Sequence, residues 1–273
     1  MNVLSQTVAL GPLVLSIGQL LLVFALVVAL IAGALAGLRR RIPVSGNLFA
    51  LVLVSLAGAR LLFVISYWSS FDGLLATLDL RDGGFSPLGG VIAGGGYAAW
   101  RLWRTPLQRG PLATALVAGA IAWGMTAGPL LVIGQHARGV PEVALTTMEG
   151  EQTDLPRLIE SREQPLVVNL WATWCPACRH EKAVFQQVQQ EEEGVTFAFV
   201  NQGEDPGQID DYLAEHAPEL ENVLLDRHQR LSDATGTRGL PATFFFDEQG
   251  QLVDSHTGQV SSASLERGLE RLR

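Results

Sequence analysis

The two cysteines, Cys175 and Cys178, form a Cys-Pro-Ala-Cys segment and are the only cysteines among 273 residues. The apolar run 166–170 before them predicts a buried strand, and the spacing over 179–190 predicts a helix. The first sulfur is therefore expected at a helix N-terminus, where backbone N–H groups and the helix dipole stabilise a thiolate. The second sulfur lies one helical turn on, within reach of a disulfide. Such a dithiol can attack a disulfide of another protein through a mixed disulfide and then release it.

The same pair of thiols could bind a metal or form a structural disulfide. A structural zinc site needs four ligands, usually two such pairs or one pair with histidines at set spacing, and the sequence has neither. Soft thiolates suit Cu(I), so a copper-binding or copper-delivery protein that borrows His180 stays an alternative. An inert disulfide is disfavoured because closing so small a loop stabilises little. We favour a redox-active dithiol, and we expect no cofactor and no metal.

Several residues around the dithiol have predicted roles. Glu181 follows the second cysteine by three residues on the same helix. If burial raises the pKa of its carboxyl, Glu181 can take the proton of the resolving thiol; as a solvated acid it would have no such role. Trp171 is expected in the core. The exposed rim, where substrates dock, is expected to be shaped by Trp174, Pro176 and Ala177.

From about residue 140 to 273 the chain resembles the thioredoxin-like fold, and within it the TlpA/ResA/DsbE branch of membrane-tethered thiol–disulfide oxidoreductases. The resemblance rests on Trp-Ala-Thr-Trp-Cys-Pro-Ala-Cys at 171–178, on Glu181, and on Gly-Leu-Pro-Ala-Thr-Phe at 239–244. It implies that the bond before Pro241 is cis and lies against the active-site cysteines. It also implies that Glu181 accepts the proton of the resolving thiol.

Two departures from that family bear on mechanism. Thioredoxin itself has a buried acid where this chain has Asn169. An amide cannot accept a proton at neutral pH, so Asn169 cannot be the base. Ala242 follows Pro241 where the cytochrome-c-maturation subgroup has a glutamate. This second departure argues against a role in the haem pathway.

Charge divides the chain into two parts. Up to Gln135 there are eight arginines and three aspartates, a balance of +5, in a mostly apolar segment. From His136 onward there are eleven basic and twenty-four acidic residues, a balance of −13. We therefore predict a transmembrane domain over 1–135 and a globular domain over 136–273. The lipid bilayer is then one partner, and the acidic domain argues against nucleic acid as another.

The first domain is predicted to hold about four membrane-spanning helices, at residues 11–38, 47–68, 85–103 and 111–134. The third predicted span is short and rich in glycine, which makes it the weakest of the set. The first lacks the basic start and short apolar core of a cleaved signal peptide, so we expect it to be retained.

Loop charges suggest an orientation. Arginine-rich loops at 39–41 and 101–109 alternate with an acidic loop at 72–82. If the basic loops are cytoplasmic, four spans place the second domain outside the cell membrane. Disulfides form and persist there, so we expect a bacterial inner-membrane protein with its dithiol in the periplasm. A miscounted third span would reverse this orientation.

A second resemblance covers roughly residues 11–103. The segments 58–64, which begins Gly-Ala-Arg-Leu, and 83–90, Gly-Gly-Phe-Ser-Pro-Leu-Gly-Gly, are similar to the N-terminal part of prolipoprotein diacylglyceryl transferase. That family has a histidine important to catalysis where this chain has Leu88, and its later half is replaced here, so transferase activity is not expected. A lipid-modifying enzyme with a fused redox domain stays the weaker alternative. Arg60 either faces a polar cavity or partner, or snorkels toward the interface.

The fold class predicted is a multi-span α-helical membrane domain followed by an α/β thioredoxin-like domain. The strands of the second domain are expected at 143–148, 166–170, 195–201, 222–225, 243–247 and 252–255, and its helices at 155–161, 179–190, 208–216, 227–235 and 261–273. We expect a membrane-anchored oxidoreductase that reduces protein disulfides. The membrane domain has no cysteine and no evident haem or flavin site to carry electrons. By resemblance, a DsbD/CcdA-type transmembrane thiol transporter would re-reduce the dithiol.

Overall fold

The computed structural model describes residues 7–10, 13–38, 45–71, 73, 77, 79, 83–133, 139–237 and 239–273. The first arginine cluster at 39–41, most of the acidic loop at 72–82 and residues 134–138 of the connector lie outside the described residues. The chain forms two compact units. One consists of 17–69 and 84–132, and the other contains 133–273 together with 1–16 and 70–83.

The first unit is helical, as predicted. Its helices are α1 (Ile17–Leu38), α2 (Ser45–Ser66), α3 (Pro87–Arg104) and α4 (Arg109–Ile133). Among the described residues, three helical stretches are long and apolar enough to cross a membrane, namely Leu20–Leu38, Ser45–Ser66 and Pro106–Leu130.

Two details of this unit differ from the prediction. Helix α3, predicted as the third span, is not among the three candidates, because its glycines and its last-turn arginines lower its hydropathy. Helix α1 begins at Ile17 instead of residue 11. An antiparallel hairpin of β1 (Thr7–Leu10) and β2 (Leu13–Ser16) precedes it in the chain.

Small residues allow α2 and α3 to approach closely. A Cβ added at Gly58 would lie 2.2 Å from the Cβ of Ala93, and one added at Gly89 would lie 2.5 Å from the carbonyl oxygen of Gly58. Neither position can carry a side chain without separating the helices. The packing of these helices therefore depends on van der Waals contact between backbones, as in other membrane-helix pairs with small interfacial residues.

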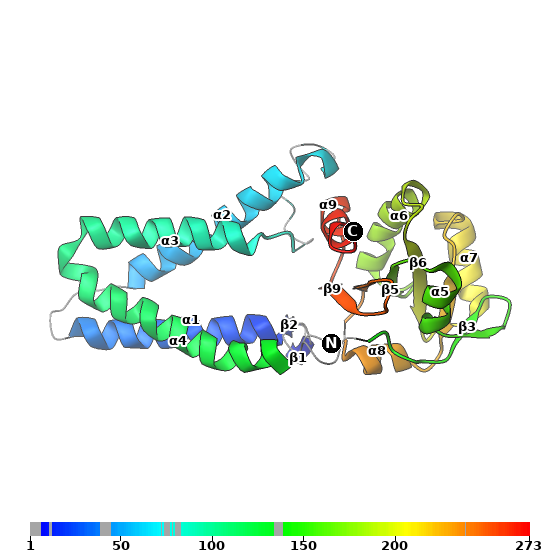
Figure 1. Ribbon diagram of the computed structural model, residues 1–273, viewed down its shortest axis with the longest axis horizontal. Coiled ribbons are helices and arrows are strands. Elements are labelled where there is room, and N and C mark those ends of the chain that lie inside the picture. The colour runs from blue at the N-terminus through cyan, green and yellow to red at the C-terminus, as the bar shows by residue number, and fades with distance from the viewer. Residues whose placement is uncertain are drawn as a thin grey trace. The chain divides into compact units, whose positions relative to one another are not determined.

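The second unit contains a seven-stranded sheet with helices on both faces (Figure 1). Its strands have the order β4-β3-β7-β6-β5-β8-β9, in which β7, β6 and β5 are parallel with β6 at the centre. Antiparallel partners flank these three strands, β3 beside β7 and β8 beside β5. The strands are β3 (Leu145–Thr147), β4 (Gln152–Thr153), β5 (Leu166–Trp171), β6 (Thr196–Gln202), β7 (Val223–Asp226), β8 (Ala242–Phe246) and β9 (Leu252–Thr257). The helices are α5 (Leu155–Arg162), α6 (Pro176–Glu191), α7 (Pro206–His216), α8 (Arg230–Thr235) and α9 (Ser262–Glu270).

Strand β5 is buried on both faces, which explains its nearly continuous apolar sequence. Val167 and Trp171 belong to the core cluster that includes residues of α6, α7 and α9. Val168 and Leu170 belong to a second cluster, with residues of α5 and α8. Alternation of side chains along the strand thus divides the helices between the two faces. Asn169 lies on the α6 face of this strand, where the site is built.

All predicted elements of this domain are present, with shifted bounds. The active-site helix starts at Pro176, earlier than predicted, because proline is well suited to the first turn of a helix. Helix α8 begins at Arg230 and not at 227, since Gln229 has a positive φ of 54°. The short strand β4 was not predicted.

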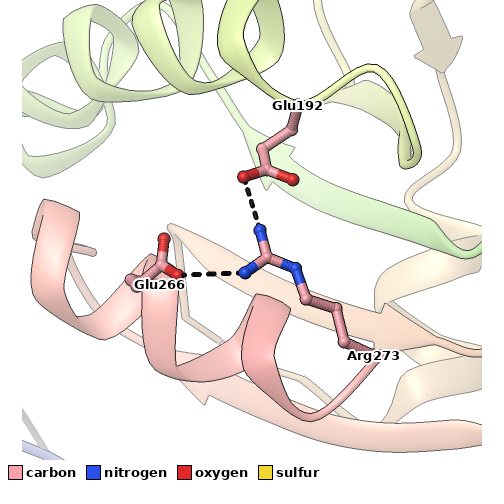
Figure 2. A network of polar contacts seen from close by, with 3 residues as sticks. All are labelled: Glu192, Glu266 and Arg273. Atoms are coloured by element: carbon pink, nitrogen blue, oxygen red, sulfur yellow. Dashed lines mark hydrogen bonds and ion pairs between the residues drawn. The ribbon is translucent and has the colours of Figure 1, made fainter.

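The last residue, Arg273, connects α9 to the end of α6. Its guanidinium donates to Glu192 at 2.6 Å and forms an ion pair with Glu266 at 3.5 Å (Figure 2). The Arg273 side chain is about half exposed, so this network contributes at most about 1 kcal/mol of stability. The pairing lies at the C-terminal end of α6, far along the helix from the dithiol.

Candidate active site

Cys175 and Cys178 are joined by a disulfide at the start of α6, with their Cα atoms 5.3 Å apart. Cys175 is the N-cap residue of the helix, and its sulfur accepts a hydrogen bond of 3.2 Å from the backbone N–H of Cys178. A thiolate at this sulfur would be stabilised by that N–H and by the helix dipole. The exposed fraction is 4% for Cys175 and 0% for Cys178, so the first sulfur is the one that reaches the surface.

Glu181 lies one helical turn after Cys178, and its side chain is fully buried. Asn169 Nδ2 donates to its Oε1 at 2.8 Å, and the backbone N–H of Val260 donates to its Oε2 at 2.9 Å. Burial raises the pKa of Glu181 to about 7, although the Lys182 ammonium and both hydrogen bonds favour the carboxylate. A carboxyl that titrates near neutrality is suited to exchange a proton with a thiol.

Asn169 connects Glu181 to a buried lysine. Its Nδ2 also donates to Thr243 Oγ1 at 3.2 Å, while its Oδ1 accepts a hydrogen bond of 2.7 Å from Lys182 Nζ. The prediction that Asn169 is not the base is consistent with this arrangement. The amide instead donates a hydrogen bond to the Glu181 carboxyl and accepts one from the Lys182 ammonium.

Sequence reasoning missed Lys182. Its side chain is 1% exposed, and Nζ lies 4.4 Å from the ring centroid of Trp171, 4.9 Å from that of Phe199 and 5.7 Å from that of Phe185. Burial lowers the pKa of Lys182 to about 7, opposed by the nearby Glu181 charge. One signal could have found it: Lys182 is the only lysine in the chain.

A second contact that was not predicted fixes the loop before Cys175. The Glu204 carboxylate accepts hydrogen bonds from the backbone N–H of Thr173 at 2.7 Å and from the Thr173 hydroxyl. Asn201 Nδ2 donates to the same carboxylate at 2.6 Å, and Arg179 Nε donates to the Thr173 carbonyl at 2.8 Å. The residue two positions before the reactive cysteine is therefore held by groups from β6, the loop after it, and α6.

Comparison with known proteins finds relatives of the C-terminal half of the chain. The Redoxin family model matches residues 135–269. The chain is 27% identical over 135 residues to the thiol-disulfide oxidoreductase ResA of Geobacillus kaustophilus, covering 49% of this chain and 75% of that protein. It is 32% identical over 120 residues to the thiol:disulfide interchange protein DsbE of Pseudomonas fluorescens biotype C, covering 44% of this chain and 65% of that protein. The C-terminal half, hereafter the redoxin domain, is thus similar to the Redoxin family and to thiol–disulfide oxidoreductases of the ResA and DsbE type.

Among solved structures, the chain resembles that of MTB DsbF in its mixed oxidised and reduced forms. The TM-score is 0.45 and the identity 26%, with 49% of this chain and 99% of that one covered.

The residues predicted to shape the site differ in their exposure. Trp174 is 65% exposed and Pro176 is exposed, whereas Ala177 is half-buried. Trp171 is fully buried, as expected of a core residue. The Leu240–Pro241 bond is cis, as the resemblance implied, and Pro241 is buried.

His180 does not turn toward the sulfurs as a third ligand. It is exposed, and its Nδ1 lies 2.7 Å from the Pro176 carbonyl oxygen one turn earlier. Within the described part of the chain, no group of three or more histidine, cysteine, aspartate or glutamate side chains is placed to hold a metal ion.

In the helical unit, the segments 58–64 and 84–90 meet. Arg60 Nη1 donates to the Gly84 carbonyl at 2.8 Å, and the Ser86 N–H donates to the Ala59 carbonyl at 3.0 Å. The Arg60 guanidinium also lies 5.9 Å from the ring centroid of Phe85. Arg60 therefore joins α2 to the segment before α3.

Proposed function

We propose that this chain is a membrane-anchored protein-disulfide reductase whose redoxin domain faces the periplasm of a bacterium. The observation that carries the proposal is the pairing of a helix-capping Cys175 with a buried Glu181 one turn beyond Cys178. This pairing supplies a nucleophile and a base for the two halves of thiol–disulfide exchange. The proposed anchor consists of α1 to α4, of which α1, α2 and α4 are long and apolar enough to cross a membrane by their own composition. A periplasmic redoxin domain requires α3 to cross as well.

In the proposed reaction the Cys175 thiolate attacks one sulfur of a substrate disulfide, and the other substrate sulfur leaves as a thiolate. Cys178 then loses its proton to Glu181 and attacks the Cys175 sulfur of the mixed disulfide. The substrate leaves with both of its sulfurs reduced, and the redoxin domain holds the Cys175–Cys178 disulfide. Two electrons have passed from the domain to the substrate.

A reductase in an oxidising compartment must have its own disulfide reduced again after each reaction. Because the chain has no cysteines other than this pair, a separate protein has to supply the electrons. We propose a DsbD/CcdA-type transmembrane thiol transporter, and we expect the anchor to keep the redoxin domain near it. In cells that lack such a transporter, the pair should accumulate as disulfide, measured by thiol alkylation and gel shift. A pair that stays reduced there would contradict this source of electrons.

The periplasmic location has its own test, because three crossings and four crossings place the domain on opposite sides of the membrane. Protease added to spheroplasts should digest the redoxin domain, while a cytoplasmic marker protein stays intact. Protection of the domain until the membrane is permeabilised would place it in the cytoplasm.

We also propose that the helical unit is a truncated relative of diacylglyceryl transferase that no longer catalyses transfer. The contact of Arg60 with Gly84 supports the relation, and Leu88 at the histidine position supports the loss of activity. Arg60→Ala should then weaken the packing of the unit and leave the dithiol chemistry unchanged. Lipid transfer by the purified chain would contradict the loss of activity.

A further inference from the structure

The chain uses arginine at all basic positions except one. Of its 19 lysine and arginine residues only Lys182 is a lysine, and it is fully buried within α6, the helix that carries the dithiol. Surface arginines need no special explanation. A single lysine in the core requires one, because burying an ammonium is costly unless the group has a specific partner.

That partner is Asn169. Among the described residues, its Oδ1 is the only hydrogen-bond acceptor of Lys182 Nζ, at 2.7 Å. The remaining surroundings of Nζ include the rings of Trp171, Phe199 and Phe185, whose faces attract a cation without accepting a conventional hydrogen bond.

The Asn169 amide points its other end at Glu181. Its Nδ2 donates to Glu181 Oε1 at 2.8 Å, so lysine, amide and carboxyl form one chain of hydrogen bonds. Hydrogen bonds in such a chain polarise one another, so a positive charge on Lys182 strengthens the bond that the amide donates to the carboxylate. Lys182 is adjacent to Glu181 in sequence, but the hydrogen bonds that connect their side chains run through Asn169 of β5.

Lysine differs from arginine in a way that matters here. A guanidinium stays charged at all accessible pH values, whereas a buried ammonium can lose its proton near neutrality. The burial of Lys182 lowers its pKa toward that of Glu181. The two groups therefore titrate in the same pH range, and the charge of one depends on the charge of the other.

We propose that Lys182 is a positioning residue for Glu181: through Asn169 it stabilises the carboxylate and so sets the pH at which Glu181 can accept the proton of Cys178. This inference rests on the proposed function for the role of Glu181. Without the ammonium, burial would hold Glu181 in its protonated form, and the acid could not take a proton at neutral pH.

Other titratable groups around the network are few among the described residues. Cys175 and Cys178 belong to the same core cluster as Trp171 and Phe185. Tyr212 packs against Trp171, with a ring-centroid separation of 5.7 Å, and Arg179 lies 5.5 Å from the Tyr212 ring. Val260 and Thr243 supply neutral groups from the segment before α9 and from β8.

The first experiment compares Lys182→Met, Glu181→Gln and the double variant in the full chain. The release of a mixed disulfide formed with a small aromatic disulfide is followed from pH 5 to 9. We expect Lys182→Met to move the midpoint of release upward by at least about one pH unit, and so to slow release at least about fivefold at pH 7. In the Glu181→Gln background the same change should have no further effect. An unchanged midpoint in Lys182→Met would overturn the proposal. A double variant whose loss of rate equals the product of the two single losses would also overturn it.

The second experiment follows the titration of Lys182 itself, first in the parent protein without any substitution and then in the Glu181→Gln variant. Because Lys182 is the only lysine, full-length protein grown on isotopically labelled lysine gives one side-chain NMR signal. We expect this signal to titrate near neutrality and its midpoint to move in the Glu181→Gln variant. A midpoint near the ordinary lysine value of about 10.4 would overturn the coupling. This titration does not depend on electron flow, so a failed reductase assay would leave it standing.

Discussion

The backbone N–H of Val260 donates a hydrogen bond of 2.9 Å to Glu181 Oε2, across 79 positions of the sequence. Val260 precedes α9, and Glu181 lies in the first half of α6. The other carboxyl oxygen is held by Asn169 of β5. The Glu181 carboxyl is thus fixed by two elements other than its own, which is the arrangement expected of a group whose orientation matters.

Glu181→Gln should slow release of the mixed disulfide on the order of 100-fold at neutral pH, because the amide cannot take the proton of Cys178. In the parent protein the pKa of Glu181 is about 7, so the rate of release should rise as pH increases through that value. The variant should lack this inflection. Stopped-flow measurement of product thiol at a series of pH values tests both statements, and an unchanged profile would remove Glu181 from the mechanism.

Cys178→Ser should trap mixed disulfides with protein substrates through Cys175, whereas Cys175→Ser should abolish reduction. The reason is the difference in access: only Cys175 has any exposed surface, and it caps the helix. Non-reducing gels followed by mass spectrometry would identify the trapped sulfur. Trapping by Cys175→Ser instead would reverse the assignment of nucleophile and resolving thiol.

The dithiol, its strand and its helix could be predicted from local sequence. An apolar run ends in Cys-Pro-Ala-Cys, and helical spacing follows; both signals lie within about two dozen residues. The exposed Trp174 and the buried Trp171 follow from their places beside that motif. The cis bond at Pro241 came from family resemblance, since a proline after a turn does not by itself indicate its isomer.

Lys182 and Glu204 could not be predicted in the same way. The run Arg-His-Glu-Lys at 179–182 has the composition of a solvated helix face, yet its second half is buried. Its hydrogen-bond partners come from β5 and from the segment before α9, and they meet only in the folded domain. Local sequence patterns carry no information on which distant amide or backbone N–H donates a hydrogen bond to a buried carboxyl. The presence of a single lysine in the chain was the one compositional signal that pointed to Lys182.

The buried pair should make stability depend on pH in a V-shaped manner. The pKa of Glu181 is raised from its ordinary value to about 7, so the unfolded chain loses its proton first and stability falls as pH rises toward 7. The pKa of Lys182 is lowered to about 7, so the unfolded chain keeps its proton longer and stability rises again above 7. Urea unfolding followed by tryptophan fluorescence, compared with the Glu181→Gln, Lys182→Met double variant, tests this. A double variant with the same pH dependence as the parent would contradict the assignment.

Glu204→Ala should loosen the loop that carries Trp174. The Thr173 N–H and hydroxyl lose their acceptor, and we expect the free energy of unfolding to fall by about 1–3 kcal/mol. Reduction of protein disulfides should slow in parallel. Arg273→Ala is the matched control, because it removes a half-exposed ion-pair network with at most about 1 kcal/mol of stability and no contact with the site. Equal effects of the two variants on reduction would show that the Thr173 contact has no role in activity.

The reduction potential of the Cys175–Cys178 pair is the measurement that tests the central claim most directly. The full chain is equilibrated in glutathione or dithiothreitol redox buffers, and the fraction of disulfide is read from alkylated protein by mass spectrometry. A protein-disulfide reductase should have a potential below about −200 mV, toward the value of about −270 mV for thioredoxin. A potential near the value of about −120 mV for the strong oxidant DsbA would contradict the proposed direction of electron flow.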